Sequence, residues 1–193
     1  MKISILDENQ KRIEFKISEC NEELANMIRR YAMSELEVFA FDKVTIYENS
    51  SNLFDEYLAH RIGLIPLAFK GTPREDDEII FSLDATGPVA IKSKDLKSSD
   101  PDIKVAFDNI LILTLAENQT LRLEAKAVPG IGRKHAKWQA GLSSYKIEND
   151  EFVFFIESFG QMQAKTMLQK TFQIIEKRAD QILQLLEKLE KKK

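Results

Sequence analysis

The stretch QMQAKTMLQKTFQIIEKRADQILQLLEKLEKKK, residues 161–193, decides the fold of this chain. It contains no glycine or proline, and its apolar residues recur at alternating spacings of four and three, the heptad pattern of a helix with one apolar seam. At about 1.5 Å per residue, a helix over this range would reach about 50 Å, longer than the core of a small domain needs. We therefore predict a long helix with part of its seam against a partner. The seam consists of Leu168, Phe172, Ile175, Ala179, Ile182, Leu186 and Leu189.

Two other roles for this helix compete with a partner-binding role. In the first, the seam packs wholly on the chain's own sheet. In the second, the helix lies on a membrane surface, which is disfavoured because such helices prefer a strongly cationic polar face. Here acidic residues lie among the basic ones, namely Glu176, Asp180, Glu187 and Glu190.

Composition indicates a globular intracellular protein. The 193 residues are 44% hydrophobic and 31% charged, and 28 basic against 31 acidic residues give 28 − 31 = −3. This charge excludes a protein whose main work is to cover nucleic-acid phosphates. Asp7 and Glu8 interrupt the N-terminal apolar stretch, and no apolar run is long enough to cross a bilayer. We expect a soluble, cytoplasmic protein that does not bind membranes.

The N-terminal part alternates between strand and helix patterns. Apolar residues at period two around residues 3–5 and 13–17 predict a β-hairpin. Asn21 is a candidate N-cap for a helix whose apolar stripe has the i, i+3, i+4, i+7 spacing. That stripe consists of Leu24, Met27, Ile28 and Tyr31. A strand over 38–47 and a second helix over 53–62, capped by Gly63, follow.

The middle of the chain predicts a small β-rich unit. Residues 117–119 are typical of a turn, so we expect the two runs that flank it to pair as a hairpin, which residues 128–132 would end. A further strand is expected over 152–156, before the long helix. The short apolar runs of the unit lie at 79–83, 88–91, 110–115 and 121–127.

A basic segment, residues 126–147, contains the only tryptophan, Trp138. Its Gly130–Lys134 stretch matches neither phosphate-loop fingerprint, which favours a basic interface loop. The competing class of function is a nucleic-acid-binding module that uses this segment directly, although aromatic residues do not alternate with the basic ones. The basic residues are Lys126, Arg133, Lys134, Lys137 and Lys146.

Residues that carry chemistry are scarce. His60 and His135 are the only histidines, and neither lies in a metal-ligand spacing. The single cysteine, Cys20, cannot form an internal disulfide or complete a zinc or iron–sulfur site, and its acidic neighbours disfavour a thiolate. We expect no metal, no cofactor and no independent catalytic centre.

Four motifs resemble those of the D-type, alpha-like subunits of archaeal DNA-directed RNA polymerase, a family that includes the bacterial alpha N-terminal domain and eukaryotic alpha-like subunits. They are LANMIRR at 24–30, FDEYLAHRIGLIPL at 54–67, GRKHAKWQ at 132–139 and FIESFG at 155–160. The resemblance implies an α+β fold with a split dimerisation domain, residues 1–43 and 150–193, that presents a two-helix dimer face. Residues 44–149 would form an inserted β-rich domain. The ferredoxin-like iron–sulfur domain of many relatives is missing, and Glu37 replaces a usual proline.

The resemblance also implies a function. The chain would be a non-catalytic assembly subunit of DNA-directed RNA polymerase, with catalysis in the two large subunits and DNA contacted only through the complex. The apolar stripe of the first helix and the seam of the last would pair with a small alpha-like subunit, called L in archaea. The large subunits, or a small zinc-bearing N-type subunit, would dock on Arg29, Arg30, His135, Lys137 and Trp138. For Trp138 a role in the core remains an alternative, and for the arginines a plain solvated helix end.

Overall fold

The structure is a computed structural model that describes residues 1–190; the last three residues of the predicted C-terminal helix lie outside this range. The chain divides into two compact units. Unit 1 combines Met1–Leu36 with the chain from Ala140 onward, and unit 2 is Glu37–Gln139. Both junctions lie earlier in the chain than the boundaries predicted at 43/44 and 149/150.

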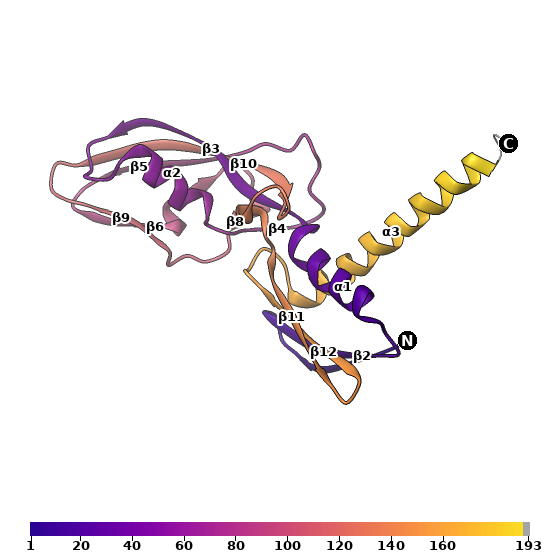
Figure 1. Cartoon of the computed structure of the whole chain (residues 1–193). Helices are drawn as coiled ribbons and strands as arrows, with labels where there is room; N and C mark the ends of the chain where they lie inside the picture. The colour runs from indigo at the N-terminus through magenta and orange to yellow at the C-terminus, as the bar shows by residue number, and fades with distance from the viewer. Residues whose placement is uncertain (191–193) are drawn as a thin grey trace. The chain divides into compact units, whose positions relative to one another are not determined.

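Unit 1 is a four-stranded antiparallel sheet with two helices (Figure 1). The predicted N-terminal hairpin is confirmed, because β1 pairs with β2. The helix start is confirmed too, since the Asn21 side chain accepts the Leu24 N–H at 3.0 Å. In the order β1-β2-β12-β11, the strands are Lys2–Glu8, Arg12–Ser18, Glu151–Ser158 and Gly141–Glu148; the helices are α1, Glu22–Ser34, and α3, Ala164–Glu190.

The core of unit 1 lies between the sheet and the two helices. Phe15 of β2 and Phe154 of β12 are directly opposite in the ladder, and their rings stack with centroids 5.0 Å apart. The buried residues of β2 alternate, which is the period-two pattern that the sequence displays. At 27 residues, α3 spans about 40 Å at about 1.5 Å per residue. Over the described part of the chain, no helix is long and apolar enough to cross a membrane.

Unit 2 is β-rich, with one α-helix, α2 (Asp55–Gly63). Its largest sheet has the strand order β3-β10-β5-β7, and two-stranded ladders β4-β8 and β6-β9 complete it. The strands are β3 Glu37–Asn49, β4 Leu67–Phe69, β5 Ile79–Thr86, β6 Val89–Lys92, β7 Lys97–Ser98, β8 Ile103–Val105, β9 Leu111–Leu115 and β10 Thr120–Ile131; short 3-10 turns, η1 and η2, cover Ser93–Asp95 and Ala136–Trp138.

The predicted hairpin between 110–115 and 121–127 is wrong. The second of these strands, β10, is central: β3 occupies one of its edges and β5 the other. The first, β9, pairs with β6 instead. The short turn favours a hairpin locally, but both edges of β10 are taken by partners distant in sequence.

β10 also continues past the predicted end at residues 128–132. It pairs with β3 as far as Ile131, including Pro129 opposite Phe39, whereas its ladder with β5 stops at Ala127. A proline lacks the N–H that a central strand needs, and it is tolerated where only one edge is paired. Likewise Gly63 is the last residue of α2 rather than its cap, because Leu64 occupies the cap position.

The strand β11 was not predicted, and it moves the second junction between the units. The family resemblance implies that residues 141–148 belong to the inserted domain, but these residues pair with β12 along their whole length in unit 1. The basic segment 126–147 is therefore not one loop. Its first lysine, Lys126, is on β10 of unit 2 and its last, Lys146, is on β11 of unit 1.

Candidate subunit interface

The first half of α3 belongs to the core of unit 1. Met167 and Thr171 are fully buried, and the Thr171 hydroxyl donates to the Met167 carbonyl at 2.7 Å. Of the predicted seam, Leu168 is also buried. Phe172 and Ile175 follow and are half-buried. Exposure thus rises along the helix.

Arg178 makes the last polar contact between α3 and α1 in the described part of the chain. Its guanidinium lies over the Tyr31 ring, 4.8 Å from the centroid, and donates to the Tyr31 hydroxyl at 2.8 Å. It also forms an ion pair with Glu35, whose side chain is nearly buried. The hydrogen bond to Tyr31, and after it the Glu35 carboxylate, raise the pKa of Arg178 above its ordinary value. These contacts hold the guanidinium in place at the end of the helix pair.

Beyond Arg178, α3 exposes a dense set of aliphatic side chains. Ala179 is exposed, and each of the five larger apolar residues that follow has more than half of its surface accessible. Four of them, at 182, 185, 186 and 189, have the i, i+3, i+4, i+7 spacing that lines one side of a helix. We call this set the α3 stripe: Ile182, 59% exposed; Leu183, 59%; Leu185, 60%; Leu186, 52%; and Leu189, 63%.

Sequence reasoning missed two members of the α3 stripe, Leu183 and Leu185. The predicted seam follows strict alternation of four and three, which selects one residue per helical turn. A search for the broader apolar face at i, i+3, i+4 and i+7 would have added Leu185, although not Leu183.

The interface predicted on α1 needs a correction. Ile28 is fully buried inside unit 1 and is part of the unit's own core, so it is unavailable to a partner. The same holds for Leu168 on α3, which is 8% exposed. Leu24, Met27 and Tyr31 are half-buried and keep part of their surface accessible. The helical stripe thus divides into a core side and a side that remains open.

The two arginines predicted to dock the large subunits differ in their surroundings. Arg29 is half-buried, and its guanidinium donates twice to the Asn26 side-chain oxygen, at 2.9 and 3.2 Å. Arg30 is exposed on the same helix. Arg29 is therefore held in position, while Arg30 extends into solvent.

Trp138 in unit 2 belongs to the core and is not an interface residue. It is 2% exposed, and its indole N–H donates to the Val128 carbonyl at 3.0 Å. The ring lies against Gly130, where an added Cβ would come within 2.6 Å of an indole carbon. The prediction that Trp138 contacts a large subunit is thus wrong, because the ring fills the space beside the glycine.

Lys137 covers the indole ring. Its ammonium lies 4.2 Å from the Trp138 ring centroid and 2.7 Å from the Asp42 carboxylate, with only 14% of the side chain exposed. The hydrogen bond from Lys137 lowers the pKa of Asp42. His135 is exposed, and its Nδ1 accepts the Lys137 backbone N–H at 3.1 Å. Of the three residues predicted here, His135 is the accessible one.

Other cations of the basic segment also have acidic partners. Lys126 bonds Glu78 at 2.9 Å, and Lys146 lies 2.9 Å from Glu148. The net positive field that the sequence indicated is therefore reduced by these neighbours.

Groups suited to metal binding do not gather in residues 1–190. Within that range, no cluster of three or more His, Cys, Asp and Glu side chains could hold a metal ion. Burial raises the pKa of the Cys20 thiol, which disfavours the thiolate form.

Comparison with known proteins identifies the family. Residues 35–145 match the family described as the RNA polymerase Rpb3/RpoA insert domain, a range that includes all of unit 2. DNA-directed RNA polymerase subunit Rpo3 of Methanocaldococcus jannaschii is 47% identical over 168 residues, which cover 86% of each chain. This chain belongs to the archaeal Rpo3 family.

Other Rpo3 proteins differ in how much of their length matches. Rpo3 of Thermococcus kodakarensis is 43% identical over 76% of this chain and 59% of its own length. Rpo3 of Pyrobaculum calidifontis is 30% identical over 96% of both chains. The predicted resemblance to alpha-like RNA polymerase subunits is thus confirmed.

Proposed function

We propose that this Rpo3-family chain is a non-catalytic assembly subunit of DNA-directed RNA polymerase. In this role unit 1 pairs with a small alpha-like subunit, and the resulting heterodimer is the platform on which the two large subunits dock. The observation that carries the proposal is the α3 stripe on a member of a polymerase-subunit family.

The energetics of the α3 stripe favour a protein partner. Burying one Leu or Ile side chain contributes about 1.5–3 kcal/mol, so five such residues in one segment supply a strong drive for association. The segment beyond Arg178 makes no further polar contact with α1 among the described residues. Because short isolated helices are marginal in water, a second helix packed on this segment would stabilise it.

The dimer face that we propose has two parts. The first is the α3 stripe, with Ala179 and the half-buried Phe172 and Ile175 at its start. The second is the accessible part of Leu24, Met27 and Tyr31 on α1. The two helices contact one another in unit 1, and in this proposal the partner's helices cover both parts.

For the large subunits we propose contacts through charged residues. Arg30 is exposed and Arg29 is oriented by Asn26, which suits a guanidinium that must meet a carboxylate in a fixed direction. In unit 2, the exposed His135 and the edge of the Lys137 side chain would face a large subunit or the small N-type subunit. DNA would be contacted only through the assembled enzyme.

We assign catalysis to the large subunits. Nucleotidyl transfer relies on carboxylate-held metal ions, and within residues 1–190 no three Asp, Glu, His or Cys side chains gather so that they could hold one. The competing nucleic-acid module is disfavoured because Lys126, Lys137 and Lys146 are engaged by carboxylates of the same chain.

The proposal is tested by reconstitution with the small alpha-like subunit and the two large subunits. Arg29→Ala combined with Arg30→Ala should leave the small subunit bound and release the large ones, because surface charges contribute little to stability yet anchor interfaces. The matched control removes two exposed cations of α3, Lys165→Ala with Lys177→Ala. If the arginine variant retains the large subunits as well as the control does, the docking role is wrong.

A further inference from the structure

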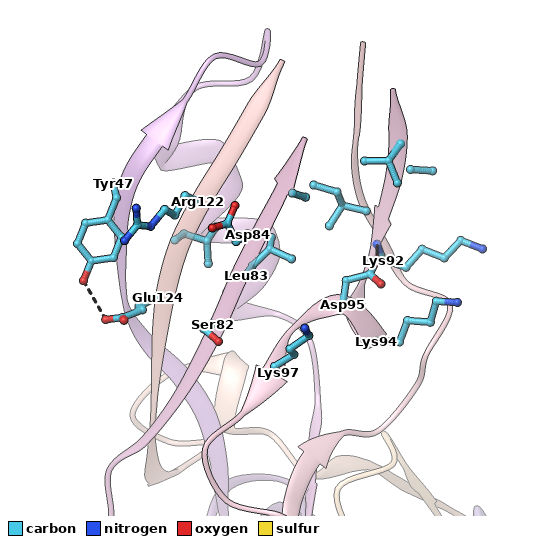
Figure 2. Close-up of a pocket in the computed structure, with 15 residues that line it drawn as sticks. Tyr47, Ser82, Leu83, Asp84, Lys92, Lys94, Asp95, Lys97, Arg122 and Glu124 are labelled. Carbon is cyan, nitrogen blue, oxygen red and sulfur yellow. Dashed lines mark hydrogen bonds between the residues drawn. The ribbon is translucent and has the colours of Figure 1, made fainter. Parts of the chain in front are cut away.

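Unit 2 contains a groove of about 1040 Å³ that the proposed function does not use. One wall is the outer face of the sheet formed by β3, β10 and β5; the other is β6 with the turn that follows it. In Figure 2, Tyr47, Arg122 and Glu124 lie on the sheet side, and Lys92 and Lys94 lie on the opposite side.

Two strand edges border this groove. β5 pairs with β10 along its whole length, but its other edge pairs with β7 only at Phe81 and Ser82. β6 pairs with β9 along one edge, and in the described range no strand occupies the other. Residues 83–86 and 89–92 therefore present backbone edges without a strand partner.

Strand alternation identifies which backbone groups point into the gap. On β5, the N–H and C=O of Ile80 bond Ser99, on the side away from β10. Alternate residues direct their backbone groups to the same edge, so Asp84 directs its N–H and C=O toward the groove. On β6, the backbone N–H of Lys92 donates to the Asp95 carboxylate at 2.7 Å. By the same alternation, the backbone N–H and C=O of Ala90 point toward the groove.

The groove has a basic side. Lys92, Lys94 and Lys97 line it, and none of their ammonium groups forms an ion pair within residues 1–190. Two of the carboxylates in the groove are engaged, Asp95 by a backbone N–H and Glu124 by the Tyr47 hydroxyl at 2.9 Å. These hydrogen bonds leave both carboxylates charged, so the four cations of the lining, the three lysines and Arg122, exceed its three carboxylates, Asp84, Asp95 and Glu124, by one. The three lysines lie on β6, the turn after it and β7, which makes that side of the groove basic.

The side chains alternate between the interior and the groove. Leu83 and Ile91, on the two bordering strands, are buried, whereas Asp84 and Ala90 beside them are exposed. A strand lying between them would direct every second side chain toward the apolar interior and the others toward the lysines. This pattern suits a segment in which apolar and acidic residues alternate.

We propose that the groove binds an extended acidic segment of another polypeptide, which adds as a strand to the free edge of β5 and places its carboxylates near Lys92, Lys94 and Lys97. Strand addition supplies backbone hydrogen bonds for affinity and alternate side chains for specificity. A single-stranded nucleic acid fits less well, because it would leave the free backbone edge of β5 unused. The proposal is independent of the assembly role.

The probe is a fluorescein-labelled peptide of eight residues that alternates Val and Glu, titrated onto the full-length chain by fluorescence anisotropy. We expect saturable binding that weakens with salt. The same peptide with Lys in place of Glu should bind at least tenfold more weakly. A Val–Glu peptide N-methylated at alternate residues, which cannot form the ladder on one edge, should lose affinity by a similar factor while the protein stays unaltered.

Protein variants test the strand pairing at β5 and the charge contacts with the lysines separately. Asp84→Pro removes the N–H that faces the groove without touching the ladder to β10 and should weaken binding at least tenfold, whereas Asp84→Ala should bind as well as the wild type or better. Lys94→Glu with Lys97→Glu should abolish binding. Its charge-matched control, Lys43→Glu with Lys104→Glu, should not. Thermal melts verify that the variants fold.

Three results would overturn the proposal. The first is equal binding of the Glu and Lys peptides, or none of the Glu peptide. The second is equal affinity for the N-methylated and unmodified peptides. The third is a single-stranded oligonucleotide that binds more tightly than the peptide and loses affinity in the Lys94/Lys97 variant.

Discussion

Replacing Ile182 and Leu186 with Asp tests the role of the α3 stripe in pairing without disturbing the core of unit 1. The two side chains are 59% and 52% exposed in the chain alone, and both lie beyond the Arg178 contacts with α1. Their replacement should therefore change the free energy of unfolding of the isolated chain by no more than about 0.5 kcal/mol, as is usual for exposed positions.

The effect on pairing should be much larger. If a partner helix buries both residues, their loss costs about 3–6 kcal/mol, at about 1.5–3 kcal/mol for each side chain. Since about 1.4 kcal/mol is tenfold in Kd, affinity for the small alpha-like subunit should fall by about 10² to 10⁴. Burying two carboxylates adds a desolvation penalty, so this range is a lower bound.

Titration calorimetry of the purified chain against the small alpha-like subunit measures this loss. The matched control is Gln181→Asp with Gln184→Asp, which adds the same charge to the same turns outside the stripe. The control should bind within a few-fold of the wild type. Equal affinities for the two double variants would refute the assignment of the α3 stripe as the dimer face.

Three further predictions concern the stability of the two units. Phe15→Ala should lower the free energy of unfolding of unit 1 by about 3–5 kcal/mol in urea denaturation, because the ring is fully buried; a loss below about 1 kcal/mol would contradict this. Gly130→Ala should destabilise unit 2 by about 1–3 kcal/mol and shift Trp138 fluorescence, since the new methyl meets the indole; an unshifted spectrum at unchanged stability would refute the contact. Because the pKa of Asp42 is lowered, its carboxylate stabilises unit 2 above the ordinary value of about 3.9, and this contribution is lost as the pH falls through the lowered folded-state value. Asp42→Asn should remove that part of the acid dependence, followed by Trp138 fluorescence; identical acid profiles would argue against it.

Local signals in the sequence were sufficient to predict the elements of unit 1 that depend on residues close to one another in the chain. The period-two residues of β2 and the Asn21 cap of α1 are both present as predicted. Their information lies within a few residues, so no knowledge of the tertiary structure is needed. The long helix was also recoverable, since nothing in its sequence breaks it.

Strand pairing in unit 2 could not be derived in this way. The turn after β9 favours a hairpin locally, yet β10 takes its partners from β3 and β5, and the choice depends on a core that several strands share. The same limit explains β11, whose polar alternation resembles a loop until β12 pairs with it.

The candidate site shows where periodicity stops being informative. Ile28 and Tyr31 have equivalent places in the helical pattern, but Ile28 is in the core and Tyr31 supports Arg178. A heptad pattern likewise does not show which of its residues are buried within the chain's own fold and which remain exposed. The division at Arg178 depends on where α1 ends, which is a property of the packed unit.

The most direct test of the assembly role is the order in which subunits bind. The tagged chain is immobilised alone or after saturation with the small alpha-like subunit, and the retained amount of each large subunit is measured by quantitative mass spectrometry. The account predicts stoichiometric retention on the preformed heterodimer and little on the chain alone. Equal retention in both cases, or no complex with the small subunit, would contradict the claim that a heterodimer built on the α3 stripe is the platform for assembly.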